Sequence, residues 1–109
     1  MNSKIICFDL DNMICLTDKS KDYKKSRSLE NNIKVINLLY DKGYGVIFFT
    51  TRYMGRCKGN AKLAEQKIKP FTIKQLKIWG VKYDKIFFGK PSYDLFVDDR
   101  IIGRMEYSS

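Results

Sequence analysis

Four short and almost uninterrupted apolar runs limit the folds that this chain can adopt. They are "KIICF" at 4–8, "GVIFF" at 45–49, "KIFF" at 85–88 and "LFV" at 95–97. Because none of them alternates apolar with polar residues, they are typical of strands that are buried on both faces, as in parallel sheets. The sequence therefore predicts four strands of a mainly parallel sheet.

The segment between the first two runs has the pattern of a helix. Ser28 is the predicted N-cap, and Gly43 marks the predicted C-terminal end. Between them lies an apolar stripe at helical spacing, formed by Ile33, Ile36, Leu39 and Tyr40.

The segment between the second and third runs predicts two helices. Residues 59–68 show a weak helical pattern, which the Lys69-Pro70 step is expected to end. The next helix is predicted to begin at a capping box formed by Thr72 and Gln75 and to stop at Gly80.

Strands that alternate with helices predict an α/β fold, here a three-layer, Rossmann-like domain with right-handed crossovers. The length of 109 residues suits one domain over 1–109 and leaves no room for a second lobe. Residues 12–27 are polar and rich in lysine, and we expect them to form a hairpin or a flexible flap after the first strand.

Composition narrows the expected location and partners. The apolar runs are far shorter than the roughly 20 residues of a membrane span, and Asp9 interrupts the N-terminal one, so neither membrane binding nor a signal peptide is expected. The 3 cysteines lack metal-binding spacing, which favours a reduced, cytoplasmic protein. A net charge of +9 favours either an anionic partner or a solvated basic surface.

A polar residue follows each apolar run. In chain order these residues are Asp9 and Asp11, then Thr50, Thr51 and Arg52, then Lys90, and finally Asp98 and Asp99. Because ligands of open α/β sheets bind beyond the carboxyl ends of the strands, we expect these side chains to converge at one edge of the sheet.

Such a cluster of carboxylates needs a counter-charge. Two carboxylates about 4 Å apart repel each other by roughly 4 kcal/mol at an effective dielectric constant near 20. Lys90 supplies one positive charge, and a hard divalent cation with oxygen ligands would supply the rest. Mg²⁺ fits this role best, whereas the absence of histidine argues against zinc. A metal beside a carboxylate, a hydroxyl and a lysine is suited to phosphoryl transfer.

Four motifs occur in a defined order along the chain. They are "FDLDNM" with Asp9 and Asp11, "VIFFTT" with Thr50, "FGKPS" with Lys90, and "LFVDD" with Asp98 and Asp99. In this ordered set, which spans nearly the whole chain, the sequence resembles the haloacid dehalogenase (HAD) superfamily of phosphatases. A single D-x-D is a weak signal, but the complete set is specific.

The resemblance implies a role for each matched residue at the first two motifs. Asp9 would be the nucleophile and a metal ligand. Asp11 would be the general acid and base, with its backbone carbonyl contacting the metal, and Thr50 would hydrogen-bond the transferred phosphoryl group. Residue i+2 lies on the same side of an extended chain as residue i, so both carboxylates can face one phosphate.

The last two motifs imply three further roles. Lys90 would hold Asp9 and the phosphate, and Asp98 and Asp99 would ligate or support the magnesium. One departure concerns Met13, which stands where family members often have threonine or valine.

The length also resembles the capless members of the superfamily, which often use neighbouring subunits to complete their site, so a homo-oligomer is an open alternative. Finer detail is similar to short phosphatases of bacterial capsule polysaccharide or surface-sugar biosynthesis. Those details are "FDLDN", "TRYMGRCKGN" and "KQLKIWGVKYDKIFFGKPSYDLFVDD".

The basic loop after the second run, at 52–60, has two interpretations. Four of its residues or near neighbours could bind the substrate's phosphate or sugar, namely Thr51, Arg52, Arg56 and Lys58. The alternative is a solvated loop.

The function that the sequence predicts is a magnesium-dependent phosphatase acting on a small phosphorylated metabolite, for which a sugar phosphate is the first choice. A response-regulator receiver is disfavoured, because its acids occur in a different order. A nucleic-acid 3′-end phosphatase, or a basic binding module with a degenerate HAD site, is the alternative. No aromatic and basic recognition motif supports nucleic-acid binding.

Overall fold

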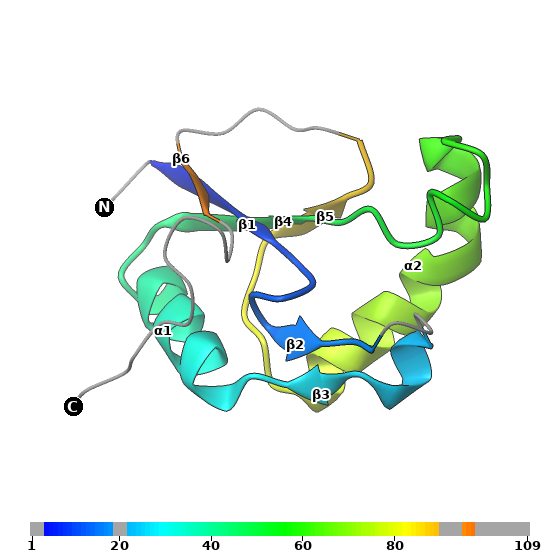
Figure 1. The fold of residues 1–109 in the computed structure, drawn as a ribbon. Helices are drawn as coiled ribbons and strands as arrows, with labels where there is room; N and C mark the ends of the chain where they lie inside the picture. The colour runs from blue at the N-terminus through cyan, green and yellow to red at the C-terminus, as the bar shows by residue number, and fades with distance from the viewer. Residues whose placement is uncertain (1–3, 19–21, 90–94, 98–109) are drawn as a thin grey trace.

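The computed structural model of the protein describes residues 4–18, 22–89 and 95–97. Four parallel strands form its main sheet, in the order β5-β4-β1-β6 (Figure 1). Their bounds are β1 Ile5–Asp9, β4 Gly45–Phe49, β5 Lys85–Phe87 and β6 Leu95–Val97. The predicted α/β fold with a mainly parallel sheet is confirmed.

The two central strands are buried on both faces. Along β1, Ile6, Cys7 and Phe8 are all at most 7% exposed, although neighbouring side chains of a strand point to opposite faces. The three central residues of β4 are buried in the same way. This burial explains why the apolar runs do not alternate.

Helix α1, Glu30–Asp41, precedes β4 in the chain and begins one residue later than predicted. Ser28 is not its N-cap, because it pairs with Cys15 in a short antiparallel ladder, and Leu29 takes the cap position without a side-chain hydrogen bond. The C-terminal end was predicted correctly, since Gly43 has a φ of 96° just beyond it.

Helix α2, Ala61–Ile78, is one continuous helix, so the predicted break at Lys69-Pro70 is wrong. Pro70 lies within it on the exposed side. A proline inside a helix costs about 3 kcal/mol, but burying each aliphatic side chain such as Ile68 or Leu76 gains about 1.5–3 kcal/mol. Packing of the buried face therefore outweighs the local penalty.

The C-terminal end of α2 agrees with the prediction, whereas the capping box predicted in its middle is absent. Asn60 is the N-cap, and its side chain accepts a 3.1 Å hydrogen bond from the Leu63 N–H. Thr72 and Gln75 are buried inside the helix and form no capping box. Gly80, with a φ of 69°, follows the last turn as predicted.

The segment after β1 forms a hairpin, which is one of the two structures predicted for it. Strand β2, Cys15–Leu16, pairs antiparallel with β3, Arg27–Ser28, and a 3-10 turn at Tyr23–Lys25 precedes β3. We call residues 12–28 the flap. Figure 1 shows its hairpin below the sheet, between the two helices.

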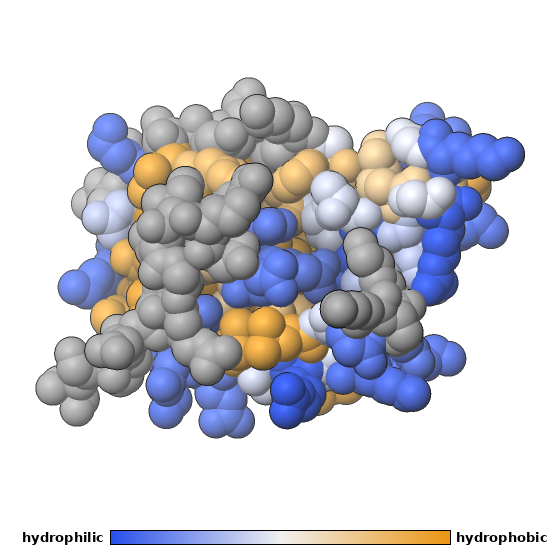
Figure 2. All heavy atoms as spheres, in the orientation of Figure 1, coloured by the Kyte–Doolittle hydropathy of each residue, from blue (hydrophilic) through white to orange (hydrophobic). Residues whose placement is uncertain are grey.

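The core lies between the sheet and the two helices. Its buried members include Phe8, Phe48, Ile36 and Leu76, one or more from each layer. On the face shown in Figure 2, hydrophilic side chains cover the outer surface of α2 at the right. Within the described ranges, no helix combines the length and hydropathy that a membrane span requires.

Candidate active site

A cavity of about 190 Å³ opens beyond the carboxyl end of β1, where the sequence predicts the site. We call it the acidic cavity. Its wall comes from the end of β1, from the flap and from the loop after β4. The lining residues are Asp9, Asp11, Asn12, Thr17, Asp18, Tyr23 and Thr51. The two predicted catalytic acids therefore border the same space.

A tight turn after β1 places Asp11 at this cavity. Asn12 has a φ of 72°, a left-handed conformation that asparagine adopts more readily than most residues. The Asn12 N–H donates to the Cys15 carbonyl at 2.8 Å, and the buried Asn32 side chain donates to the Met13 carbonyl at 2.7 Å. Met13 itself is fully buried, so the departure from the family pattern fills the core.

Asp11 is held by the side chain of Arg52. The Arg52 Nη2 atom lies 3.0 Å from Asp11 Oδ1, and the Nε atom lies 3.2 Å from Oδ2, so the guanidinium contacts both carboxylate oxygens. The Arg52 side chain is 0% exposed, whereas that of Asp11 is 26% exposed. Arg52 thus lies in the interior of the protein, and Asp11 lies at the cavity wall.

The other side of the guanidinium forms hydrogen bonds with side chains of helix α2. Arg52 Nη1 donates to Gln75 Oε1 at 2.7 Å and to Thr72 Oγ1 at 3.3 Å. The Tyr23 ring covers the group, with its centroid 4.4 Å from the Arg52 Cζ atom. A buried charge needs such partners, because removing it from water costs several kcal/mol.

The structure gives Arg52 a different place from the predicted one. The sequence predicts a contact with substrate, but the buried guanidinium lies behind Asp11 and is not part of the cavity wall. Charged residues are rarely fully buried, so the sequence alone favoured an exposed position. The signal for burial was the presence of Thr72 and Gln75 within the apolar face of α2.

The two threonines after β4 have different environments. Thr50 is 1% exposed, and its Oγ1 atom accepts a 3.0 Å hydrogen bond from the Arg52 backbone N–H. Thr51 is exposed and borders the acidic cavity. The role of Thr50 in holding a phosphoryl group stays a prediction.

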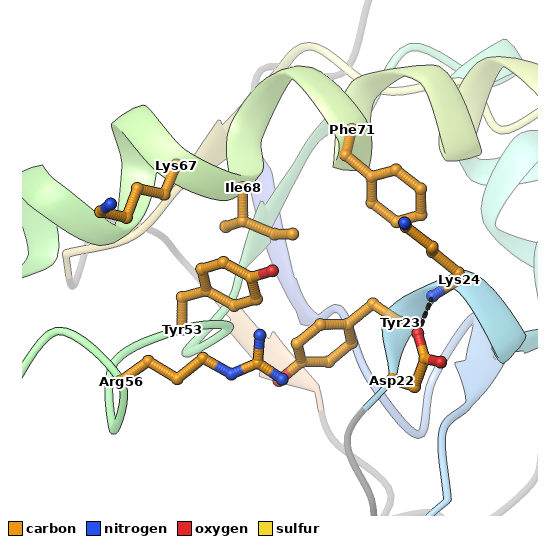
Figure 3. A pocket seen from close by; sticks show the side chains of 8 residues that line it. All are labelled: Asp22, Tyr23, Lys24, Tyr53, Arg56, Lys67, Ile68 and Phe71. Atoms are coloured by element: carbon orange, nitrogen blue, oxygen red, sulfur yellow. Dashed lines mark hydrogen bonds between the residues drawn. The ribbon is translucent and has the colours of Figure 1, made fainter.

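The other two cations of the predicted basic loop, Arg56 and Lys58, are exposed, whereas Arg52 is buried. Arg56 is exposed, and its guanidinium carbon lies 4.4 Å from the centroid of the Tyr53 ring. Lys58 is exposed and has a φ of 52°. Arg52 and Arg56 therefore differ in burial, although the Arg52 guanidinium lies over the Tyr23 ring and that of Arg56 lies beside it (Figure 3).

Lys90, Asp98 and Asp99 lie outside the described residues, so their predicted places are not tested. The described neighbour of the last two is β6, which pairs in parallel with β1. Its final residue, Val97, is level with Phe8, one residue before Asp9.

The oxygen-rich wall of the acidic cavity suits a hard cation. Asp9 and Asp11 offer carboxylates, and Asn12 and Thr17 offer further oxygen atoms, which are the ligand types that Mg²⁺ prefers. Among the residues that the structure describes, no three His, Cys, Asp or Glu side chains cluster closely enough to hold a metal. Two of the four predicted metal ligands, Asp98 and Asp99, lie outside the described residues.

Two of the buried cysteines, Cys7 and Cys15, remain protonated at neutral pH. Burial raises the pKa of Cys15 to about 12, and the nearby Asp11 charge adds to this shift. Cys15 Sγ can thus donate to Asp11 Oδ1, which lies 3.4 Å away. Burial, with a contribution from Asp9, likewise raises the pKa of Cys7 to about 11. A thiolate nucleophile is therefore disfavoured at either position.

Tyr23 connects the flap to the site, although it was not among the predicted site residues. Its ring covers Arg52 and borders the acidic cavity. Burial raises the pKa of its phenol, and the Asp11 charge acts in the same direction, so the hydroxyl stays protonated. A lone aromatic residue among lysines gave no sequence pattern that could have identified it.

Comparisons with known proteins support the fold. Neither a protein-family model nor a curated protein matches this sequence. A crystal structure of an MCSG target from Vibrio cholerae superposes with a TM-score of 0.73 at 26% sequence identity. The match covers 82% of this chain and 72% of that chain. The protein is therefore an α/β protein of Rossmann-like architecture.

Proposed function

We propose that the protein is a magnesium-dependent phosphatase that hydrolyses a small phosphate monoester through an aspartyl-phosphate intermediate. The observation that carries this proposal is the placement of Asp9 and Asp11 on one cavity wall at the end of a central parallel strand. The order of the HAD-like motifs along the chain supports the same function.

The proposed reaction has two steps. In the first, an Asp9 carboxylate oxygen attacks the phosphorus atom, the bond to the leaving oxygen breaks, and Asp11 gives that oxygen a proton. In the second, Asp11 takes a proton from a water molecule, which attacks the phosphorus of the aspartyl-phosphate. Inorganic phosphate leaves and the Asp9 carboxylate is restored.

The buried Arg52 serves this scheme as a positioning residue. Its contacts with both oxygens of Asp11 fix the direction of that carboxylate, and its bonds to α2 fix the guanidinium in turn. Magnesium, when bound, would offset negative charge on the phosphate oxygens. Asp9 and Asp11, together with Asp98 and Asp99, are the residues proposed to hold it.

Three finer proposals come from the sequence: the substrate class and the oligomer rest on the resemblance, and the location rests on the cysteines, which lack metal-binding spacing. The substrate is a small phosphorylated metabolite, with a sugar phosphate as first choice and a place in capsule polysaccharide biosynthesis. The protein acts in the cytoplasm. A homo-oligomer would complete the open site.

The test is phosphate release from 4-nitrophenyl phosphate in the presence of Mg²⁺. Asp9→Asn is expected to abolish release while its circular dichroism and unfolding transition stay native. The matched control is Asp41→Asn, an exposed acid at the end of α1 that pairs with Lys82. Unchanged release by Asp9→Asn, or no release by the wild-type protein, contradicts the proposal.

A further inference from the structure

A second and larger cavity, of about 400 Å³, adjoins the acidic cavity. We call it the aromatic cavity. Tyr23 borders both cavities, so the two spaces share one wall residue. The other walls come from the loop after β4 and from the middle of α2, as Figure 3 shows.

One side of the aromatic cavity is apolar. Ile68 and Phe71 project from α2 toward it, and the rings of Tyr23 and Tyr53 lie opposite them (Figure 3). The two tyrosine rings are 6.0 Å apart at an angle of 42°, so they meet at a tilt. Such a wall suits the flat or apolar body of a small organic molecule.

The charged residues of this cavity are mostly cationic. Lys24, Arg56 and Lys67 border it, against a single acid, Asp22. The Asp22 carboxylate accepts a 3.2 Å hydrogen bond from the Lys24 backbone N–H, which caps the 3-10 turn. The balance therefore favours an anionic group in the cavity.

Arg56 is the cation placed most definitely. Its guanidinium stacks on the Tyr53 ring at 4.4 Å, and Figure 3 shows it between the rings of Tyr53 and Tyr23. Tyr53 has a φ of 65°, a costly conformation for a bulky residue. A stacked, planar guanidinium is suited to bind a carboxylate or phosphate with two hydrogen bonds.

We propose that the aromatic cavity binds the leaving-group part of the substrate, and that this part carries a second anionic group next to a flat or apolar body. The inference rests on the proposed phosphatase function. The ester phosphate would occupy the acidic cavity, the body of the substrate would pass Tyr23, and the second anion would meet Arg56. The substrate class is thus a phosphate ester whose alcohol carries a carboxylate or a second phosphate.

The test compares two aryl phosphates of equal size, 4-carboxyphenyl phosphate and its neutral isostere 4-carbamoylphenyl phosphate, with the meta isomers alongside. A charge-assisted hydrogen bond changes affinity by about 10- to 100-fold. We expect kcat/KM to be at least about tenfold higher for the carboxylate in the wild-type protein. Arg56→Gln should bring that ratio close to one, chiefly through KM.

The matched control is Arg27→Gln, because Arg27 is an exposed arginine of the flap that borders neither cavity. It should keep the wild-type ratio. A wild-type ratio near one, or equal ratios in the Arg56→Gln and wild-type proteins, overturns the inference while leaving the phosphatase proposal intact.

Binding provides the readout that is independent of turnover. Calorimetry with (4-carboxyphenyl)methylphosphonate and its carbamoyl analogue should give the same preference, again lost in Arg56→Gln. If neither phosphate ester is hydrolysed but this preference is found, the proposed function fails and the anion site stands. If neither analogue is preferred, the anion site fails.

Discussion

The guanidinium of Arg52, which is completely buried, lies 3.0 Å from the Asp11 carboxylate at the wall of the acidic cavity. This pair joins three parts of the fold, because Arg52 follows β4, Asp11 follows β1, and Gln75 of α2 binds the same guanidinium. The direction of a candidate catalytic carboxylate is therefore set from the interior of the protein.

Arg52→Ala is expected to lower the free energy of unfolding by about 3 kcal/mol, because it removes one partner of a largely buried ion pair. Urea denaturation measures the change. The control Arg27→Ala, at an exposed position, should change the free energy by less than about 0.5 kcal/mol. A loss below about 1 kcal/mol in Arg52→Ala would show that the pair is not a structural element.

Asp11→Asn tests the proposed acid and base. We expect kcat to fall by about 10²- to 10⁴-fold, the usual contribution of a positioned proton donor. The fall should be larger for an alkyl phosphate than for 4-nitrophenyl phosphate, because the poorer leaving group depends more on protonation. Equal losses with both substrates would assign Asp11 a different role.

Gln75→Leu tests how helix α2 supports the flap. The Gln75 amide accepts from Arg52 and donates to the backbone carbonyl of Tyr23. Its removal should cost about 1–3 kcal/mol, because it leaves buried polar groups without a partner. Hydrogen exchange should also become faster in residues 22–28. Gln66→Leu, an exposed change on the same helix, should alter neither measurement.

Pro70→Ala tests the continuity of α2. Alanine restores a backbone N–H at an exposed position inside the helix, where proline costs about 3 kcal/mol. Part of this gain is offset, since proline also restricts the unfolded chain by up to about 1 kcal/mol. We therefore expect the free energy of unfolding to rise by about 2 kcal/mol in urea denaturation. Lys74→Ala, also exposed on α2, should change it little, and a decrease in Pro70→Ala would contradict this account.

The sequence was sufficient for the sheet, because burial on both faces produces an unbroken apolar run that needs no further context. Residues 45–49, for example, were predicted with the bounds that β4 has. The D-x-D at Asp9 and Asp11 was placed correctly at a strand end for the same reason.

The errors arose where long-range packing decides between local alternatives. Pro70 and the Thr72–Gln75 spacing both indicated a helix boundary. No other feature of the neighbouring sequence argued for a continuous helix there. Ala64, Ile68, Thr72 and Leu76 are nevertheless spaced by four residues and form one buried face. Read as one face, that series would have predicted a single helix. It would also have placed the polar side chain of Thr72 in the interior, where it needs a buried partner such as Arg52.

The buried thiols predict how stability depends on pH. The pKa is about 11 for Cys7 and about 12 for Cys15 in the folded protein, whereas an unfolded thiol ionises near pH 8.5–9. Above that pH the unfolded chain binds fewer protons than the folded one, so alkaline pH favours unfolding. The stability that each thiol contributes is fully present below about pH 8.5 and falls by up to about 1.4 kcal/mol per pH unit until the folded pKa is reached.

Urea denaturation between pH 8 and pH 10, with a reductant present, measures this dependence. Cys7→Ala and Cys15→Ala should each lower the free energy of unfolding at pH 8, because both side chains are buried. Each variant should then lose less stability than the wild-type protein as the pH rises, since one thiol no longer ionises on unfolding. If the pH dependence of a variant runs parallel to that of the wild-type protein, the substituted thiol is not protected from ionisation by the fold.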